Sequence, residues 1–469
     1  MRLRLLAPCA AVAVSMLAYT PPAEACGGCF PPQGEQASIV TDHRMVMTVS
    51  AQQSTLYDQI RYQGSPSEFA WILPITQGGA AVVGISADSL FNGLDTLTSL
   101  VIQEPPRNCP RPPAECTRDL DSAGSGSSSG GLSGGSLDGG VSVIKEEVVG
   151  PYQTVQLQPT TENDTAAVLD WLAANKYVVP DDIKPIIAQY TKEHFNFLAL
   201  RLRPGEGVQS MRPVRVTTPG SNVALPLRMV AAGTGANVGI TLWVVSNGRF
   251  QTTNFESFVI RDEEITWDWT TGTSNYRDLR AERTTAGEGK VWEVESSIAT
   301  FRAQIASAAR SAAIGGGAFG AGGDYLEVKD EQTGAIEKTA AQVEDEDYDV
   351  LEAGLTGGTL HVTRLRADLT RAALANDLTV GASSDQTEVP RTRQPKLENG
   401  QPLCPVFRGC DATGEQLPRD EAIAKSSGNE TDGTFTCRAA TSRVNASVSV
   451  ALGFLAVVMG RAVRRRRRS

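Results

Sequence analysis

The stretch Tyr62-Gln-Gly-Ser-Pro-Ser-Glu-Phe-Ala-Trp-Ile-Leu-Pro-Ile75 decides the predicted fold, because it is the densest apolar and aromatic run in the first half of the chain. In an extended segment, the side chains from Phe69 to Leu73 are apolar on both sides, which predicts a strand buried on both faces. Pro74 restricts this strand to the edge of a sheet or to a strand end. The alternating run Arg44–Ser50 is its expected hairpin partner.

Working outward, the rest of the pattern predicts an α+β body of mostly antiparallel strands with about five helices. Helical spacing of apolar residues is strongest in the segments 276–285 and 291–313. Weaker helical patterns occur at 86–100, 162–175, 181–194 and 367–376. Strand-like runs occur at 141–149, 152–157, 197–202, 214–217, 227–231, 240–246, 257–260, 325–328 and 359–365.

Composition divides the chain into segments. The body is expected to run from residue 26 to residue 379. Residues 122–140 are almost all Ser and Gly, a composition that cannot bury a core, and predict a disordered, flexible insertion within that body. Residues 380–443 are polar and predict an extended stalk.

The first 25 residues have the features of a secretory signal peptide. Basic residues precede an apolar run from Leu5 to Ala18, and Ala23-Glu24-Ala25 supplies small residues at the two positions that signal peptidase reads. We therefore expect cleavage between Ala25 and Cys26. Lipidation of Cys26 is the alternative, although Glu24 stands where lipoprotein signals need a small neutral residue.

The other end of the chain predicts a membrane segment at residues 444–463. Its apolar run Asn445–Gly460 is about 16 residues long, the short limit for a helix that spans a bilayer. Arg461 and the run Arg464–Arg468 follow, which places the tail at 464–469 in the cytoplasm by the positive-inside rule. The alternative, a core helix with a nucleic-acid-binding tail, conflicts with the predicted export.

Charge argues against nucleic acid as a partner. The whole chain has 43 basic and 53 acidic residues, a net charge of −10. Without the predicted signal peptide, Arg461 and the arginine tail, 35 basic and 52 acidic residues remain, a net charge of −17. This acidic body has no polybasic stripe, so we expect no nucleic acid to bind it.

Seven cysteines follow the predicted signal peptide, and their short spacings in an exported chain predict local disulfides. The predicted pairs are Cys26–Cys29, Cys109–Cys116 and Cys404–Cys410. Other pairings stay open. A zinc site would need a second tight pair, which the sequence lacks. A thioredoxin-like role for the Cys26-Gly-Gly-Cys29 motif is a further alternative, but no predicted strand precedes the motif and two prolines follow it.

The seventh cysteine, Cys437, stands a few residues before the apolar tail segment. Cysteine, short spacer, apolar segment and arginine run together resemble the myxobacterial C-terminal sorting signal. The resemblance covers the last 33 residues. It implies that a membrane-embedded protease processes the chain near Cys437 and leaves the protein at the cell surface. The alternative is a plain single-pass anchor with an idle thiol.

Two further patterns bear on chemistry. Asp345, Asp347 and Asp349 alternate like the start of a calcium loop, but Val350 and Thr356 stand where such a loop needs glycine and glutamate. A solvated acidic loop is therefore expected, with calcium binding as the alternative.

The chain has only three histidines, His43, His194 and His361, and their spacing matches no metal site. His43 is a candidate base at a strand end, where a structural role is the simpler expectation. We predict no catalytic residue, no metal site and no cofactor. A histidine beside a carboxylate in one cleft would instead favour an enzyme.

Several short segments together resemble the bacterial family labelled domain of unknown function 2330. They are Cys26-Gly-Gly-Cys-Phe30, Met45-Val-Met-Thr-Val49, Tyr62–Ile75, Ser89-Leu-Phe-Asn-Gly-Leu94, Ala173-Ala-Asn-Lys-Tyr177, Phe197-Leu-Ala-Leu-Arg-Leu202 and His361-Val-Thr-Arg-Leu-Arg366. The resemblance extends from about Cys26 to Leu378. The family has no established activity, so it implies an exported protein and no site residues.

Together these patterns predict an exported protein anchored to the cell envelope or cell surface, of structural or binding type. Its expected partners are the membrane, through the C-terminal helix, the processing protease, and an envelope protein or polysaccharide. The alternative is an envelope enzyme or thiol-redox protein that uses Cys26 and Cys29, or a histidine–carboxylate site assembled by the fold.

Overall fold

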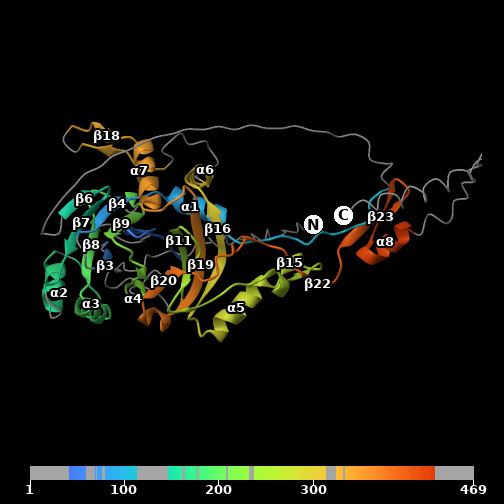
Figure 1. Ribbon diagram of the computed structural model, residues 1–469, viewed down its shortest axis with the longest axis horizontal. Helices are drawn as coiled ribbons and strands as arrows, with labels where there is room; N and C mark the ends of the chain where they lie inside the picture. The colour runs from blue at the N-terminus through green and yellow to red at the C-terminus, as the bar shows by residue number, and fades with distance from the viewer. Residues whose placement is uncertain are drawn as a thin grey trace, which may run out of the picture. The chain divides into compact units, whose positions relative to one another are not determined.

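The computed structural model describes residues 42–59, 69, 71–76, 80–112, 146–160, 164–175, 177, 179–207, 210–231, 237–312, 324–330 and 333–427 (Figure 1). These residues belong to two compact units. The first unit contains the described residues up to Pro106 and those from residue 146 to Gln401. The second unit contains residues 107–112 and 402–427.

An eight-stranded sheet forms the centre of the first unit, with the strand order β13-β16-β19-β11-β1-β2-β9-β4. Neighbouring strands are antiparallel except for the parallel pairs β1–β11 and β13–β16, which confirms a mostly antiparallel α+β fold. The strands are β1 (Asp42–Val49), β2 (Gln53–Asp58), β4 (Val82–Ile85), β9 (Val214–Pro219), β11 (Asn237–Ser246), β13 (Glu256–Phe258), β16 (Val291–Thr300) and β19 (Leu360–Thr370).

The stretch Tyr62–Ile75 contributes β3 (Trp71–Ile75), which is buried along its whole length and lies at a sheet edge, as the sequence predicts. The predicted hairpin between this strand and Arg44–Ser50 is wrong. The segment Arg44–Ser50 lies in β1 up to Val49, and β1 pairs with β2 and β11 instead. The reason is local, because Ser50 N–H donates to the Gln53 carbonyl and closes a tight turn directly into β2.

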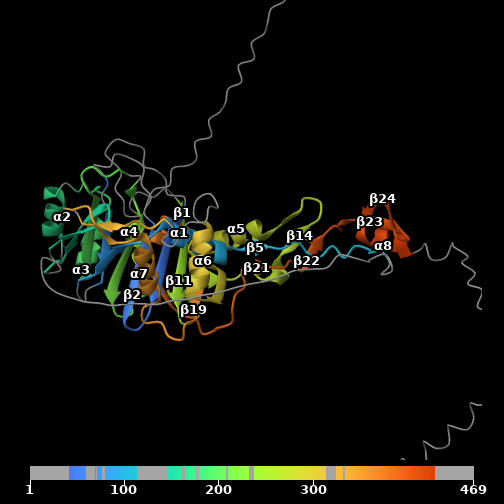
Figure 2. The same cartoon turned by 90° about the horizontal axis from the view of Figure 1, so that it is seen from above.

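β3 belongs to a second sheet of order β3-β8-β7-β6, with β6 (Glu146–Val149), β7 (Tyr152–Leu157) and β8 (Asn196–Leu202). One face of this sheet packs on β4 and β9 of the large sheet through apolar residues such as Trp71 and Val216. The other face is covered by α2 (Thr165–Ala174) and α3 (Lys184–Lys192). Figures 1 and 2 both show these two helices side by side at one end of the first unit.

The large sheet is covered on both faces. The helices α1 (Asp88–Thr98), α6 (Arg302–Ala312) and α7 (Ala340–Glu352) pack on one face around the buried Trp243. The opposite face carries a small sheet of order β10-β20-β12 and the short helix α4 (Leu227–Val230), packed around Trp292. The strands of this small sheet are β10 (Ala224–Leu225), β20 (Leu378–Ala382) and β12 (Phe250–Thr252).

Four predicted helices are confirmed, as α1, α2, α3 and α5 (Tyr276–Ala286). The prediction of one helix over 291–313 is wrong, because residues 291–300 form β16 and only Arg302–Ala312 is helical. The predicted helix at 367–376 is also wrong, since it divides between β19 and the 3₁₀ turn η6 (Ala373–Ala375). The predicted strand at 227–231 is α4. The described residues contain eight α-helices in all, more than expected.

Residues 380–401 are part of the first unit, in contrast to the predicted stalk. Val389 is buried in the core, and β21 (Thr392–Arg393) pairs in parallel with β5 (Val101–Ile102). The remaining short elements of this unit are β14 (Thr266–Asp268), β15 (Thr273–Ser274), β22 (Leu397–Asn399), β17 (Val328–Lys329), β18 (Ile336–Lys338) and η4 (Asp262–Glu264).

The second unit is a hairpin of β23 (Leu403–Arg408) and β24 (Asp411–Pro418), followed by α8 (Arg419–Ser427). Cys404, Val406 and Ala422 form its buried cluster. Residues 402–427 are thus folded and not extended, because even these few apolar side chains face one another.

The predicted signal peptide (1–25), the Ser/Gly insertion (122–140), the membrane segment (444–463) and the arginine tail (464–469) lie outside the described residues. Within the part of the chain that the structure describes, no helix is both long and apolar enough to cross a membrane.

Candidate functional site

The cysteines form a disulfide that the sequence did not predict. Cys109 bonds to Cys404, with Cα atoms 5.3 Å apart, across a separation of 295 residues. The predicted pairs Cys109–Cys116 and Cys404–Cys410 are therefore wrong, because folding brings the segment 107–112 against β23. Cys410 is also disulfide-bonded. Cys26, Cys29, Cys116 and Cys437, with the predicted cleavage and processing sites, lie outside the described residues.

His43 lies beside a carboxylate, the arrangement that would favour an enzyme. Its Nε2 atom is 2.9 Å from Asp58 Oδ1, and both side chains are buried between β1 and β2. The cavity next to Asp58 has a volume of about 10 Å³ and is lined by apolar residues such as Met45 and Trp71. The pair resembles a catalytic base with a carboxylate that orients it. The cavity, however, holds at most one water molecule and has no room for a substrate.

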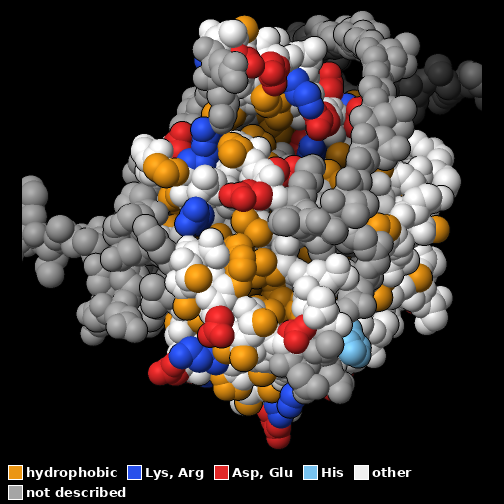
Figure 3. All heavy atoms as spheres, turned by 90° about the vertical axis from the view of Figure 1, so that its left-hand side faces the viewer, with side chains coloured by type: hydrophobic (Ala, Val, Ile, Leu, Met, Phe, Trp, Pro, Cys, Tyr) orange, Lys and Arg blue, Asp and Glu red, His pale blue; other side chains and the backbone are white. Residues whose placement is uncertain are grey.

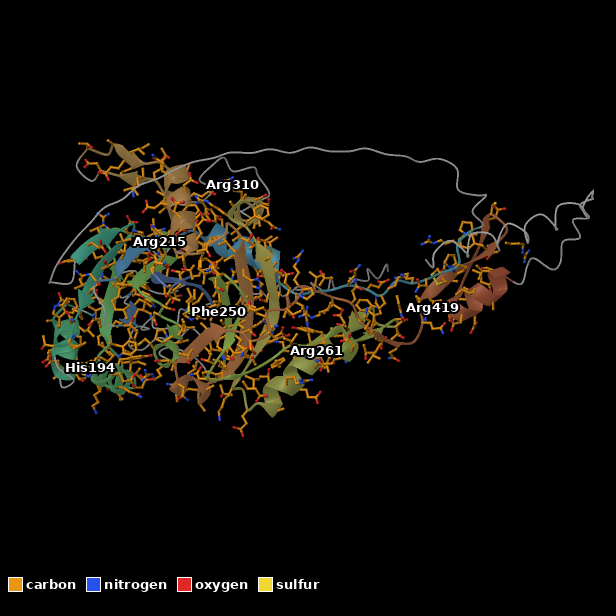
Figure 4. The ribbon with its side chains drawn as sticks, in the orientation of Figure 1. His194, Arg215, Phe250, Arg261, Arg310 and Arg419 are labelled. Atoms are coloured by element: carbon orange, nitrogen blue, oxygen red, sulfur yellow. A yellow bond between two sulfur atoms is a disulfide. The ribbon has the colours of Figure 1, made fainter. Side chains whose placement is uncertain are left out.

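The other two histidines lie on different elements of the first unit. His194 follows α3 on the surface, with a left-handed φ of 64° (Figure 4). His361 lies in β19, where its Nε2 atom is 2.8 Å from Ser297 Oγ of the neighbouring strand β16. The structure therefore brings no two histidines into a common site among the described residues.

Ser297 and His361 end a chain of hydrogen bonds. Phe250 N–H donates to Thr363 Oγ1 at 3.2 Å, and Thr363 Oγ1 is 2.7 Å from Ser297 Oγ. The labelled Phe250 in Figure 4 marks where this chain begins. The Phe250 N–H can only donate, so Thr363 Oγ1 accepts from it. In the simplest arrangement of the hydroxyl hydrogens, Thr363 then donates to Ser297 and Ser297 donates to His361 Nε2.

Electrostatics around His361 agree with this direction. Burial lowers the pKa of His361, the carboxylate of Glu388 acts against this effect, and the charge of Arg249 adds to it. A neutral imidazole offers one ring nitrogen as an acceptor, which matches an incoming Ser297 hydroxyl. A serine that donates to a histidine is the arrangement of a nucleophile and its base.

The side chains of Ser297 and His361 are buried and have little contact with solvent. Ser297 has no exposed surface and His361 is 9% exposed. Val389, which lies outside the named strands, pairs with Ser297 of β16 through two backbone hydrogen bonds. The segment 383–389 is held in place by Gln386, whose amide donates to the Arg249 carbonyl at 3.0 Å. In this structure the hydroxyls of Ser297 and Thr363 therefore act to satisfy one another inside the fold.

The aspartates that resembled a calcium loop lie on the helix α7, so the predicted acidic loop is wrong. Asp347 is fully buried and accepts from Ser86 Oγ (2.5 Å), Tyr325 O–H (2.8 Å) and Arg215 Nη1 (2.7 Å). Figure 4 labels Arg215 in the interior of the first unit. A helix turns its side chains by about 100° per residue, so it separates the alternating aspartates that a calcium loop would gather.

On the outer side of α7, Asp345 and Asp349 both pair with Arg302 of α6. Burial raises the pKa of Asp347, against the opposing effects of Arg215 and the two hydroxyl donors. Asp347 thus fastens the inner side of α7 to Ser86, Arg215 and Tyr325, and Asp345 and Asp349 fasten its outer side to α6. No group of three His, Cys, Asp or Glu side chains within the described ranges is placed to hold a metal ion.

A second cavity of the first unit is also small. A cavity between β2, β3 and β9, lined by Leu56, Leu73 and Val216 among others, has a volume of about 30 Å³. That is room for water molecules and far below the size of a site that encloses a small molecule.

Sequence reasoning found the histidines but missed their partners. Ser297 and His361 are 64 residues apart and lie in no motif. The Asp58 partner of His43 is 15 residues away, and only the turn between β1 and β2 shows that these strands pair. The pairing of these two strands was therefore the one feature that could have indicated the contact between His43 and Asp58.

The fold and these sites define an α+β protein of two packed sheets with covering helices, whose polar groups of chemical interest are buried. Residues 21–374 match the family described as an uncharacterized protein conserved in bacteria (DUF2330). The chain belongs to this family, as its sequence segments predict. No curated protein and no solved structure matches the chain.

Proposed function

We propose that the chain is an exported protein of the bacterial cell envelope, held at the membrane by its C-terminal segment and acting as a structural or binding protein. The single observation that carries the export is the disulfide between Cys109 and Cys404. Disulfides persist in oxidising compartments such as the periplasm and the cell surface, and are rare in the cytosol.

The anchor is proposed from the sequence. Residues 444–463 supply the apolar segment, and the arginines that follow keep its far end in the cytoplasm. A membrane-embedded protease then processes the chain near Cys437. An envelope protein or a polysaccharide is the partner that such a location offers.

Fractionation of cells that express the full chain tests the anchor. Leu455→Arg places a charge in the apolar segment at a cost of about 2.5–3.5 kcal/mol on insertion scales, so this variant should move to the periplasm or medium. The matched control Leu455→Ile should stay with the membrane. A Leu455→Arg protein that remains membrane-bound, or a wild-type protein in the cytosol, contradicts the proposal.

Cys437→Ala tests the processing step separately. The apolar segment is unchanged in this variant, so the chain should stay in the membrane and keep its arginine tail. Mass spectrometry of the C-terminal peptide reads the outcome. A variant trimmed at the same place as the wild type excludes Cys437 as the processing signal.

A second candidate function is favoured by one observation, the hydrogen bond between Ser297 and His361. An envelope hydrolase would use Ser297 as the nucleophile and His361 as the base. A fluorophosphonate probe tests this reading, because it labels only a serine that a base activates and a ligand can reach. Labelling of the wild type that is lost in Ser297→Ala supports an enzyme. Absence of labelling, which the buried serine predicts, supports the binding or structural protein.

A further inference from the structure

A cluster of aromatic and hydrogen-bonding side chains lies where α2 ends over the second sheet. The ring of Trp171, near the end of α2, lies 6.0 Å from the ring of Tyr177, centroid to centroid. Asn175 fixes the end of the helix, since its side-chain amide donates to the Trp171 carbonyl at 2.9 Å. Figure 3 views this end of the unit and shows apolar side chains gathered near its middle, with charged side chains above and below them.

The sheet supplies the charged part of the cluster. Arg201 of β8 pairs in register with Gln153 of β7, and Gln153 with the exposed Val148 of β6. Arg201 Nε donates to Gln153 Oε1 at 3.0 Å, and its Nη1 donates to the Asn175 carbonyl at 3.2 Å. These bonds hold the guanidinium in a fixed position at the end of α2, where its charge also acts on Tyr177.

The cluster offers donors that no other described residue accepts from. The indole N–H of Trp171, the hydroxyl of Tyr177, Nη2 of Arg201 and Nε2 of Gln153 have no hydrogen-bond partner among the described residues. Burial raises the pKa of Tyr177 to about 12, so its hydroxyl stays protonated and remains a donor. Arg201 forms no ion pair with a carboxylate in the described part of the chain, although the protein is acidic overall.

We infer that this cluster is a binding site for a polysaccharide that carries carboxylate groups. A sugar ring presents an apolar face that packs on a half-buried indole, and its many oxygens accept from donors around the ring. A guanidinium recognises a carboxylate by charge-assisted hydrogen bonds. Glu146 is the acidic residue that acts on Tyr177, and its exposed side chain stays in solvent.

This site rests on the proposed envelope function and names its ligand class. An exported binding protein meets acidic polysaccharide at the cell surface, and the site combines one cation, several donors and the half-buried ring of Trp171, which packs on the buried Tyr177. A neutral glucan lacks the carboxylate that Arg201 would bind, so it should bind more weakly at this cluster.

Calorimetric titration of the full chain in detergent tests the site with polygalacturonate, a polymer of one uronic acid. Its fully methyl-esterified form is the matched probe, because it has the same sugar without the charge. Arg201→Met should weaken binding of polygalacturonate at least tenfold, since hydrogen bonds to charged groups are the strong ones. Arg277→Met, the same substitution on an exposed arginine of α5, should bind like the wild type.

Tyr177→Phe removes only a hydroxyl that has no hydrogen-bond partner among the described residues, so the fold should be unaffected. It should weaken binding by about 2- to 10-fold, the range for one neutral hydrogen bond. Equal binding of the charged and esterified polymers, no binding by the wild type, or unchanged binding in both variants overturns the site.

The two proposals fail separately. If the wild type does not bind polygalacturonate but still fractionates with the membrane, only the site is overturned. If the chain is cytosolic while binding depends on Arg201 and Tyr177, the envelope location is wrong and the site stands.

Discussion

Glu293 should make the stability of the first unit depend on pH. Its side chain is 1% exposed, accepts from Tyr276 O–H at 2.5 Å and from Arg280 Nε at 3.0 Å, and fastens α5 to β16. Burial raises the pKa of Glu293 to about 7, with the charge of Glu295 adding to this and Tyr276 and Arg280 opposing it. The native state therefore holds a proton on Glu293 that the unfolded chain has released.

This difference in protonation between the native and unfolded states decides whether stability rises or falls with pH. Below about pH 4.5 both states are protonated, and between 4.5 and 7 only the native state is, so stability falls as the pH rises through that window. At 1.36 kcal/mol for each pH unit, the loss is about 3 kcal/mol, and it is complete above pH 7. Glu293→Gln has no titrating group here and should not show this loss.

Urea denaturation of the full chain in detergent, followed by tryptophan fluorescence from pH 4.5 to 8, measures the effect. The free energy of unfolding of the wild type, minus that of Glu293→Gln, should fall by about 3 kcal/mol across this range. Glu282→Gln, which removes one exposed charge from α5, is the control and should follow the wild type. A constant difference between wild type and Glu293→Gln would refute the reasoning.

Two further predictions concern buried contacts. Asp347→Ala removes the buried carboxylate of Arg215 and leaves this guanidinium only the exposed Glu346 as an ion-pair partner, so it should cost about 3–5 kcal/mol of unfolding free energy. Asp345→Ala on the exposed side of the same helix should cost under about 1 kcal/mol, and equal costs in the two variants would contradict the assigned roles. Gly93→Ala should cost about 1–3 kcal/mol, because its new Cβ would lie 2.6 Å from the Ala309 backbone, where α1 and α6 meet. An unchanged urea midpoint would show that the two helices can separate freely.

The sequence predicted those features of the fold that depend on residues close to one another in the chain. Trp71–Ile75 is apolar at every position, so burial on both faces followed from composition alone, and Pro74 correctly placed it at an edge. Its pairing partner did not follow, because many alternating runs of the chain match it equally well. Register depends on which strands fold side by side.

The errors have a common physical origin. Val291–Thr300 is buried on both faces in its first seven residues, so its apolar residues follow no clear period, and a buried strand resembles a helix in such a pattern. Asp347 looked like a solvated acid until the fold placed Arg215 beside it. Cys109 and Cys404 lie 295 residues apart, a separation at which spacing carries no information on pairing.

The redox state of Cys109 and Cys404 in living cells tests the claim of export most directly. Cells are quenched in acid, free thiols are blocked with a maleimide, and the unreduced peptides are identified by mass spectrometry. The account predicts that the peptide with Cys109 is joined to the peptide with Cys404 and that neither carries maleimide. Recovery of both cysteines as maleimide adducts would contradict the disulfide and the export that rests on it.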